Sequence, residues 1–267
     1  MPAQTRIGTA GWALSAREAE TFPGDGTHLQ RYARVMDCVE INSSFYRSHR
    51  PQTYERWAAS TPEDFRFAVK LPRAITHQRR LKDAGALLAQ FAAEAGGLGA
   101  KWAVALVQLP PSLPFAPGVA ERFFAQVHGV FRGAVVCEPR HASWFTPQAG
   151  QWLHDSQVSR AGVDPTPAGC PEAAEPGGWL GLVRYYRWHG SPRTYWSSYD
   201  SAWLQERAQA LRRPPAGAAC WCIFDNTAAG AALPNALQLR ASERRMNQQE
   251  NSLMTAVAIP RLARTVD

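Results

Sequence analysis

Eight short β-rich runs recur along the chain, and their spacing constrains the fold more than any other feature of the sequence. The first run begins at residue 6 and the last at residue 220, so the mean interval is close to the ~30 residues of a βαβ unit. Several runs are apolar on both faces until their last residues, which is typical of parallel strands covered by helices. The runs occupy residues 6–12, 38–45, 65–72, 102–110, 134–140, 159–165, 179–188 and 220–227.

Amphipathic or alanine-rich stretches fill most gaps between the runs, and this alternation predicts an α/β fold, specifically a (β/α)8 TIM barrel. An open doubly wound sheet is the alternative. Against this alternative, the chain has no GxGxxG motif after its first β-rich run, and eight evenly spaced repeats favour closure of the sheet into a barrel. A single barrel domain is expected over residues 1–240, followed by a peripheral C-terminal extension at 241–267. Helices are expected over residues 27–36, 51–60, 83–99, 116–129, 146–156, 198–213 and 229–240.

One connection departs from this pattern. Residues 166–178, TPAGCPEAAEPGG, are rich in Pro, Gly and Ala and leave no room for a full helix. The connection follows a strand on the side where barrel active sites form, so it is either a mobile lid or a shortened connection without functional motion.

The composition is that of a globular protein, with 45% hydrophobic and 19% charged residues. No apolar run reaches the ~18 residues of a membrane span, and the start of the chain lacks a secretory signal, so a cytoplasmic location without membrane contact is expected. The net charge of +7 raises the prospect of an anionic small molecule or a nucleic-acid fragment as partner. Only three of the 29 cations are lysines, so a compositional bias toward Arg is an alternative explanation.

The five cysteines do not form a disulfide framework, because their number is odd and most lie in apolar, strand-like runs. Cys220 and Cys222 share one face of a strand, which is too few ligands for zinc. Reduced, buried thiols are expected.

Polar side chains follow the predicted strands at the points where seven of them end. In a barrel the carboxyl ends of the strands meet on one side, where binding and catalytic groups gather. A purely structural core would not tolerate so many converging polar groups, so a pocket is predicted at this C-terminal mouth. The strand-end residues are Glu40, Asn42, Ser44, Lys70, Gln108, Glu138, Arg140, His141, Trp144, Asp164, Arg187, His189, Asp225 and Asn226.

Six ordered segments resemble the motifs of the YecE-like family, known as domain of unknown function 72: VEINSSFY (39–46), KLPRAITH (70–77), LVQLPPS (106–112), EPRHASWF (138–145), YRWHG (186–190) and FDNTAAGAALPNALQL (224–239). The resemblance covers residues ~6 to ~240 and implies a TIM barrel, but no established activity. Asp225 departs from the family pattern, which commonly has an amide there, so this carboxylate either pairs with an Arg or changes the ligand preference. The family-like positions are Glu40, Asn42, Phe45, Tyr46, Lys70, Pro72, His77, Gln108, Glu138, Arg140, His141, Trp144, Arg187, His189, Gly190, Asn226 and Asn235.

Binding of a phosphorylated or other anionic ligand is the first hypothesis, with Arg140 and Arg187 as a guanidinium clamp. If the protein is an enzyme, a hydrolase or lyase, Glu40 or Glu138 is the expected general acid or base. His141 or His189 is then the proton shuttle. In a purely structural network, Glu40 would pair with Lys70, and Glu138 or Asp164 with Arg187. The substrate-binding candidates are Asn42, Tyr46, Lys70, His77, Gln108, Arg140, Trp144, Asp164, Arg187 and Asn226.

Three further hypotheses remain open. Glu138, Asp164, His141 and His189 could hold a divalent metal for phosphodiesterase or nuclease chemistry. Lys70 could form a Schiff base, as strand-end lysines of aldolase-type barrels do. A non-enzymatic nucleic-acid surface could combine base-stacking aromatics with cations. Its residues would be Trp12, Tyr46, Trp144, Trp188, Tyr195, Trp196 and Tyr199, with Arg47, Arg50, Arg73, Arg79, Arg80 and Arg193.

Overall fold

The computed structural model describes residues 5–18, 20–211 and 218–258. Each of the eight predicted β-rich runs overlaps a strand, and the sixth run contains two short strands separated by Ala161. The two-residue strand β8 was not predicted. The strands are β1 Thr5–Thr9, β2 Cys38–Ile41, β3 Arg66–Lys70, β4 Trp102–Gln108, β5 Ala134–Glu138, β6 Ser159–Arg160, β7 Gly162–Asp164, β8 Gly177–Gly178, β9 Val183–Trp188 and β10 Ala219–Phe224.

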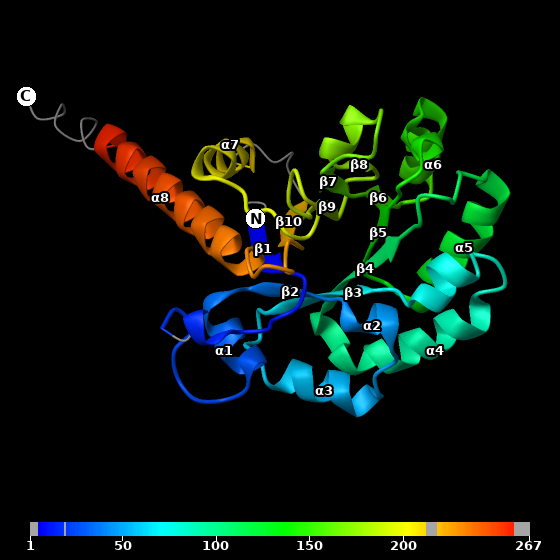
Figure 1. The fold of residues 1–267 in the computed structure, drawn as a ribbon, viewed down its shortest axis with the longest axis horizontal. Helices are drawn as coiled ribbons and strands as arrows, with labels where there is room; N and C mark the ends of the chain where they lie inside the picture. Colours follow the sequence, from blue (N-terminus) through cyan, green and yellow to red (C-terminus); the bar gives the residue numbers. More distant parts are fainter. Residues whose placement is uncertain (1–4, 19, 212–217, 259–267) are drawn as a thin grey trace, which may run out of the picture.

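The strands pair as two sheets (Figure 1). One sheet has the order β1-β10-β9-β7 and is parallel throughout, whereas the other has the order β2-β3-β4-β5-β6-β8 and is parallel except at β8. A single parallel bridge from Ala10 to Glu40 joins the β1 and β2 ends, and Ala161 separates β6 from β7. The α/β class with parallel sheets is therefore confirmed. Closure of eight strands into one barrel is not confirmed and stays a prediction.

Helices surround the strands on their outer side (Figure 1). The side chain of Thr27 caps α1 in a capping box with Gln30, and Pro51 occupies the first turn of α3, as the sequence predicts. The α-helices are α1 His28–Val35, α2 Ser43–Tyr46, α3 Pro51–Ala59, α4 Gly85–Ala95, α5 Pro117–Val130, α6 Pro147–Asp155, α7 Ser201–Leu211 and α8 Ala232–Ala258. Shorter helical turns span Ala16–Glu18, Ala74–Gln78, Gly96–Lys101, Ala142–Phe145 and Pro171–Ala174.

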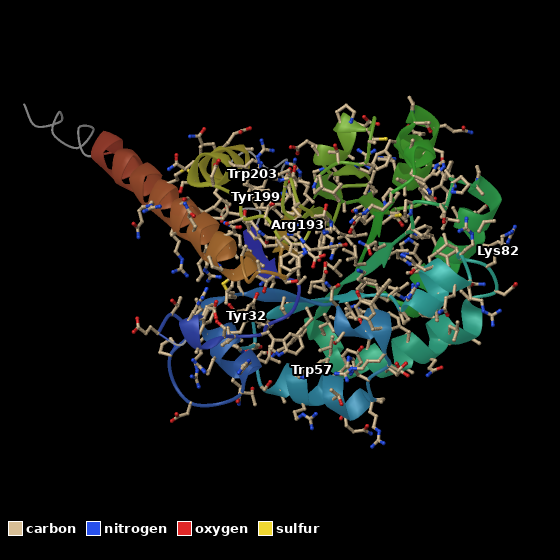
Figure 2. All side chains as sticks on the ribbon, in the orientation of Figure 1. Tyr32, Trp57, Lys82, Arg193, Tyr199 and Trp203 are labelled. Atoms are coloured by element: carbon tan, nitrogen blue, oxygen red, sulfur yellow. The ribbon has the colours of Figure 1, made fainter. Side chains whose placement is uncertain are left out.

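Two buried clusters hold these layers together. The larger cluster packs strands against helices and includes Tyr199, whose ring stacks on the partly buried Trp203 with centroids 3.9 Å apart (Figure 2). The smaller cluster draws on strands of both sheets, with Tyr185 from β9 and Val104 from β4 among its members. Both sheets therefore bury one face in a shared core. All five cysteines are free and buried, as expected.

The connection over 166–178 contains a short helical turn and β8 rather than an open loop. Cys170 and Ala173 are buried, and the Arg160 guanidinium donates to the Glu172 carbonyl at 3.1 Å. These contacts fasten the segment to β6, and motion of a lid stays untested.

Helix α8 continues without a break across the predicted domain boundary at residue 240, and its distal half projects from the rest of the protein (Figure 1). Arg240 anchors its base through an ion pair with Asp37 at 3.1 Å. Residues 259–267 of the predicted extension lie outside the described residues. Within the described ranges, no helix combines the length and apolarity that a bilayer crossing needs.

Candidate functional site

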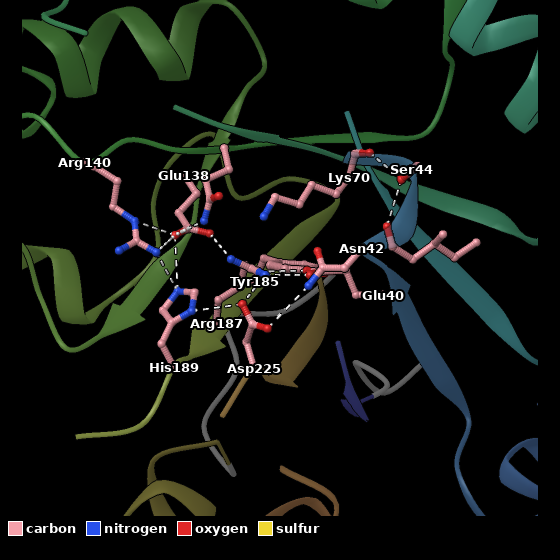
Figure 3. A network of polar contacts seen from close by, with 12 residues as sticks. Glu40, Asn42, Ser44, Lys70, Glu138, Arg140, Tyr185, Arg187, His189 and Asp225 are labelled. Atoms are coloured by element: carbon pink, nitrogen blue, oxygen red, sulfur yellow. Dashed lines mark hydrogen bonds and ion pairs between the residues drawn. The ribbon is translucent and has the colours of Figure 1, made fainter. Parts of the chain in front are cut away.

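Arg187 lies at the centre of a network of polar side chains at the carboxyl ends of the strands (Figure 3). It is 0% exposed, because Tyr185 on its own strand and carboxylates from three other strand ends surround it. Its Nε and Nη2 donate to Glu40 at 2.9 and 2.6 Å, and Nη1 donates to Glu138 at 2.5 Å. Nη2 also donates to Asp225 at 2.8 Å. We call this set the strand-end network; its members are Glu40, Lys70, Gln108, Glu138, Arg140, Tyr185, Arg187, His189 and Asp225.

Glu138 is the most heavily bonded carboxylate of the network. Besides the bond from Arg187, it accepts from Arg140 Nε at 2.7 Å and from Gln108 Nε2 at 3.0 Å. Burial alone would raise the pKa of Glu138, but Arg140, Arg187 and His189 outweigh that cost and hold the pKa well below its ordinary value. Glu138 is therefore ionised, which suits it to orient cations and makes it a poor general acid.

His189 connects the two ends of the network. Its Nδ1 lies 3.1 Å from Asp225 Oδ2, and its Nε2 lies 3.0 Å from Arg140 Nη2 and 3.2 Å from Glu138 Oε1. Because Arg140 can only donate, neutral His189 has its proton on Nδ1, facing Asp225, and a lone pair on Nε2. A second proton on Nε2 would turn that atom from an acceptor for Arg140 into a donor to Glu138. Both ring nitrogens of His189 therefore have partners within the network.

Asp225 lies at the end of β10 and completes the group of carboxylates around Arg187. Burial would raise its pKa, but Arg187 and His189 lower it below the ordinary value. Asp225 thus pairs with Arg187, the first of the two alternatives considered for this carboxylate. Asn42 Nδ2 reaches Asp225 Oδ1 at 3.4 Å, whereas the buried Asn42 Oδ1 has no hydrogen-bond partner among the described residues.

Lys70 is the last residue of β3 and is 6% exposed. Its Nζ makes no hydrogen bond or ion pair with any residue that the structure describes; it lies 4.3 Å from the centre of the Phe45 ring. Burial and then the charge of Arg187 lower the pKa of Lys70 to about 8. The predicted Glu40–Lys70 pair does not form, because Arg187 and Tyr185 occupy both oxygens of Glu40.

His77 lies on the outer side of Lys70, with its ring 5.0 Å from the ring of Phe45. Burial, followed by the charges of Lys70, Arg73 and Arg140, lowers the pKa of His77. The outer side of the network therefore has a positive potential, although three carboxylates and three cations balance within the network.

A cavity of about 890 Å3 lies beside the network, and Asn42, which reaches Asp225, lines it. Two tryptophans and two histidines are among its lining residues, with Trp12 and Trp57 edge to face at a centroid distance of 5.0 Å and His49 against Trp57 at 5.1 Å. Arg47, Glu18 and Ser15 supply polar groups. Sequence reasoning did not identify this cavity, because its walls come from the segment after β1, from α2 and α3, and from the start of α8.

Five other predicted site residues do not join the network. His141 bonds to Ser143 Oγ at 2.9 Å, and Asp164 accepts from the Tyr199 hydroxyl at 2.7 Å. Trp144 is 1% exposed and packs on Phe115, so it belongs to the core. The remaining two are Tyr46, which is 78% exposed, and Asn226, which bonds to Asn235 Oδ1 at 2.9 Å.

The four predicted metal ligands are consequently not brought together: Glu138 and His189 are in the network, whereas His141 and Asp164 have other partners. Within residues 5–18, 20–211 and 218–258, no three His, Cys, Asp or Glu side chains are placed to hold one metal ion.

The aromatic set expected for nucleic-acid binding is divided by burial. Trp188 and Tyr199 are 2% and 6% exposed and cannot stack on a base, as is true of Trp144. Tyr46, Tyr195 and Trp196 are exposed, and Arg193 lies over the Trp196 ring at 4.3 Å.

Tyr185, a member of the network, was not among the predicted residues, and Tyr195 was predicted only for a nucleic-acid surface. The β-rich run that contains Tyr185 gives no sign that its hydroxyl donates to Glu40 at 2.8 Å. Tyr195 has a backbone φ of 70°, which is strained for an aromatic residue, and its ring lies edge-on to His189 at 5.7 Å. The strained backbone at Tyr195 therefore holds its ring against His189, edge-on, at the border of the network.

This α/β chain belongs to the family described as "Protein of unknown function DUF72", which it matches over residues 6–260. It is 31% identical over 147 residues to the UPF0759 protein YecE of Escherichia coli K12, a match that spans 53% of each chain. A shorter match, 34% over 74 residues, links it to the UPF0759 protein YunF of Bacillus subtilis and covers 27% of this chain and 26% of that protein. The matched regions thus span about half the length of YecE and about a quarter of that of YunF.

Solved structures of DUF72 proteins share the fold. A DUF72 protein from Enterococcus faecalis V583 superposes with a TM-score of 0.74 at 19% identity, covering 90% of this chain and 96% of that one. A DUF72 protein from Thermotoga maritima gives 0.69 at 21% identity, with coverage of 89% and 98%.

Proposed function

We propose that the strand-end network binds a small anionic molecule, phosphorylated or carboxylated. The observation that carries the proposal is that two cations keep unused donors: Lys70 Nζ, and Arg140 Nη1, for which the described residues offer no partner. The Arg140 side chain is 21% exposed, so its outer edge is accessible. Burial and then neighbouring cations lower the pKa values of Lys70 and His77, and an anion bound there would offset the second of these causes.

Arg187 has a different role in this proposal from the clamp that the sequence suggested. Its donors are taken by Glu40, Glu138 and Asp225, and it is fully buried. A ligand could reach it only by displacing a carboxylate. Arg187 therefore holds the acidic groups in place, and Lys70, His77 and Arg140 contact the ligand.

The adjoining cavity favours a ligand larger than an inorganic anion. Its two tryptophans suit an apolar or ring-shaped part, and Ser15, Glu18 and Arg47 would bond to polar groups of a ligand. The paired His189 and Asp225 would supply the proton transfer if the bound molecule reacts.

Calorimetry with glycerol 3-phosphate, with glycerol as the uncharged match, tests the proposal. We expect the phosphate to bind and glycerol not to bind. Arg140→Met should weaken binding at least about tenfold, as the loss of a charge-assisted pair does. The matched control, Arg122→Met on the exposed side of α5, should leave binding unchanged.

Absence of heat and of thermal stabilisation at millimolar phosphate would refute the proposal. A short single-stranded oligonucleotide serves as a further arm. Binding of the oligonucleotide without binding of glycerol 3-phosphate would favour the nucleic-acid alternative instead.

A further inference from the structure

We propose that Lys70 is a nucleophilic amine that forms an imine with an aldehyde or ketone at the strand-end network. The three carboxylates whose charges act on it, Glu40, Glu138 and Asp225, have other partners, and its Nζ makes no hydrogen bond or ion pair with the residues that the structure describes. The acidic group that we assign to the substrate rests on the proposed anion binding above.

Contacts from α2 determine the position of the Lys70 side chain. The single Ser44 hydroxyl proton is shared between the Lys70 carbonyl at 2.7 Å and the Ile41 carbonyl at 3.0 Å, which fastens α2 to the ends of β2 and β3. This fixes the Phe45 ring against the Lys70 amine. The side chain runs from the end of β3 toward Glu138 and Arg187 (Figure 3), where the guanidinium repels its charged form.

Desolvation and a neighbouring cation are the two means by which proteins make a lysine nucleophilic near neutral pH. At a pKa of about 8, about a tenth of the Lys70 amine is neutral at pH 7, against well under a thousandth for an ordinary lysine. The other two lysines differ in their surroundings. Lys101 Nζ donates to three oxygens of Ala58 and Thr61 at 2.7 to 3.1 Å, and Lys82 is exposed at the edge of the molecule (Figure 2).

The chemical step is balanced by the substrate and the protein alone. The amine lone pair attacks the carbonyl carbon, the C=O π pair moves to oxygen, and a proton transferred from nitrogen to oxygen gives a carbinolamine. Expulsion of water with the C–O bonding pair and loss of the remaining nitrogen proton then form the C=N bond. His189 lies in the same network and is the group that can take up and return the protons, while Arg140 and His77 hold the acidic part of the substrate.

Borohydride trapping on the full-length protein tests the imine, because hydride addition to the C=N carbon makes it a stable secondary amine. The probes are glyceraldehyde 3-phosphate and glyceraldehyde, which share one aldehyde and differ in the phosphate. Peptide mass spectrometry should place the adduct at Lys70, about tenfold or more above Lys82 at pH 7. Lys70→Arg should abolish that adduct, and Lys82→Arg, the matched control, should leave it.

The two proposals fail in distinguishable ways. Equal trapping of both probes at Lys70 would support the imine and contradict the anion preference. Adducts at Lys82 without one at Lys70 would overturn the imine, whatever glycerol 3-phosphate does in calorimetry. The mapping uses the wild-type protein, so it does not depend on whether the Lys70 variant folds.

Discussion

Arg187 donates to both carboxylate oxygens of Glu40, which lies 147 residues earlier in the chain and in the other sheet. Glu138, which accepts a third bond from Arg187, also belongs to that other sheet. One guanidinium on β9 therefore ties the four-stranded sheet to β2 and β5 of the six-stranded sheet. The tie is completely buried, so water cannot replace a missing partner.

Removal of the Arg187 charge should destabilise the fold strongly. Arg187→Met leaves three buried carboxylates without their shared cation, and loss of one partner from a buried ion pair costs about 3–5 kcal/mol. Urea denaturation measures the loss. Arg184→Met on the same strand, where the partner Glu175 is half exposed, should cost less than about 1 kcal/mol. Equal stability of wild type and Arg187→Met would disprove the tie.

Lys70 makes folding stability rise at alkaline pH. Its pKa is 10.5 in the ordinary state and about 8 in the folded protein, so between these values the unfolded chain binds the proton that the folded chain has released. Below pH 8 the buried charge of Lys70 lowers the free energy of unfolding by its full amount. As the pH rises from 8 to 10.5, the free energy of unfolding increases, by about 3 kcal/mol at most. Lys70→Met should remove this rise, as measured by the difference between the two denaturation curves across pH. The same rise in both proteins would contradict it.

Glu243 on α8 has the opposite dependence. Burial and then the charge of Asp37 raise its pKa from 4.5 to about 7, so the folded chain retains a proton that the unfolded chain has released. Stability from this group is full below pH 4.5 and is lost as pH rises to 7. Glu243→Gln should stabilise the protein at pH 8 by about 1–3 kcal/mol and have little effect at pH 4.

Thermal denaturation at the two pH values checks this prediction for Glu243. Glu121→Gln on the exposed face of α5 is the matched control and should change neither value. A Glu243→Gln variant that stabilises equally at both pH values would show that packing, rather than titration, causes the change.

Asp225→Asn should tighten anion binding. The substitution removes one buried negative charge from beside Lys70 and His189, and such a charge opposes a bound anion by about 1 kcal/mol or more. The affinity for glycerol 3-phosphate should rise about five- to tenfold. Unchanged or weaker binding in calorimetry would place the anion away from this end of the network.

The positions of strands and helices could be predicted because each depends on a local pattern. The apolar run 134–140 contains β5, and Thr27 and Pro51 begin helices where their capping chemistry requires. The family resemblance and the α/β class followed in the same way, and both are confirmed. Closure into one barrel depends on contacts between distant strands, which no local pattern specifies.

The pairing within the site could not be predicted to the same depth. Strand adjacency suggested Glu40 with Lys70, and β2 and β3 are indeed neighbours. Glu40 instead pairs with Arg187 from the other sheet, because the planar guanidinium donates to both carboxylate oxygens in a bidentate fork that an ammonium lacks. Trp144 was assigned to the ligand because it follows a strand end, yet its loop turns it into the core, where its Nε1 donates to the Leu113 carbonyl.

The tie made by Arg187 also limits how this protein can change. Because Glu40, Glu138 and Asp225 share one buried cation, a neutral residue at any one of the four positions alters the net charge of a buried region. A single substitution at one of these positions is expected to lower the stability, even where a double substitution that keeps the net charge is tolerated. Sequence variation at the strand ends should therefore concentrate at Lys70, His77 and Arg140, which make fewer contacts with the rest of the fold. Substitution of these residues should change ligand binding more than stability.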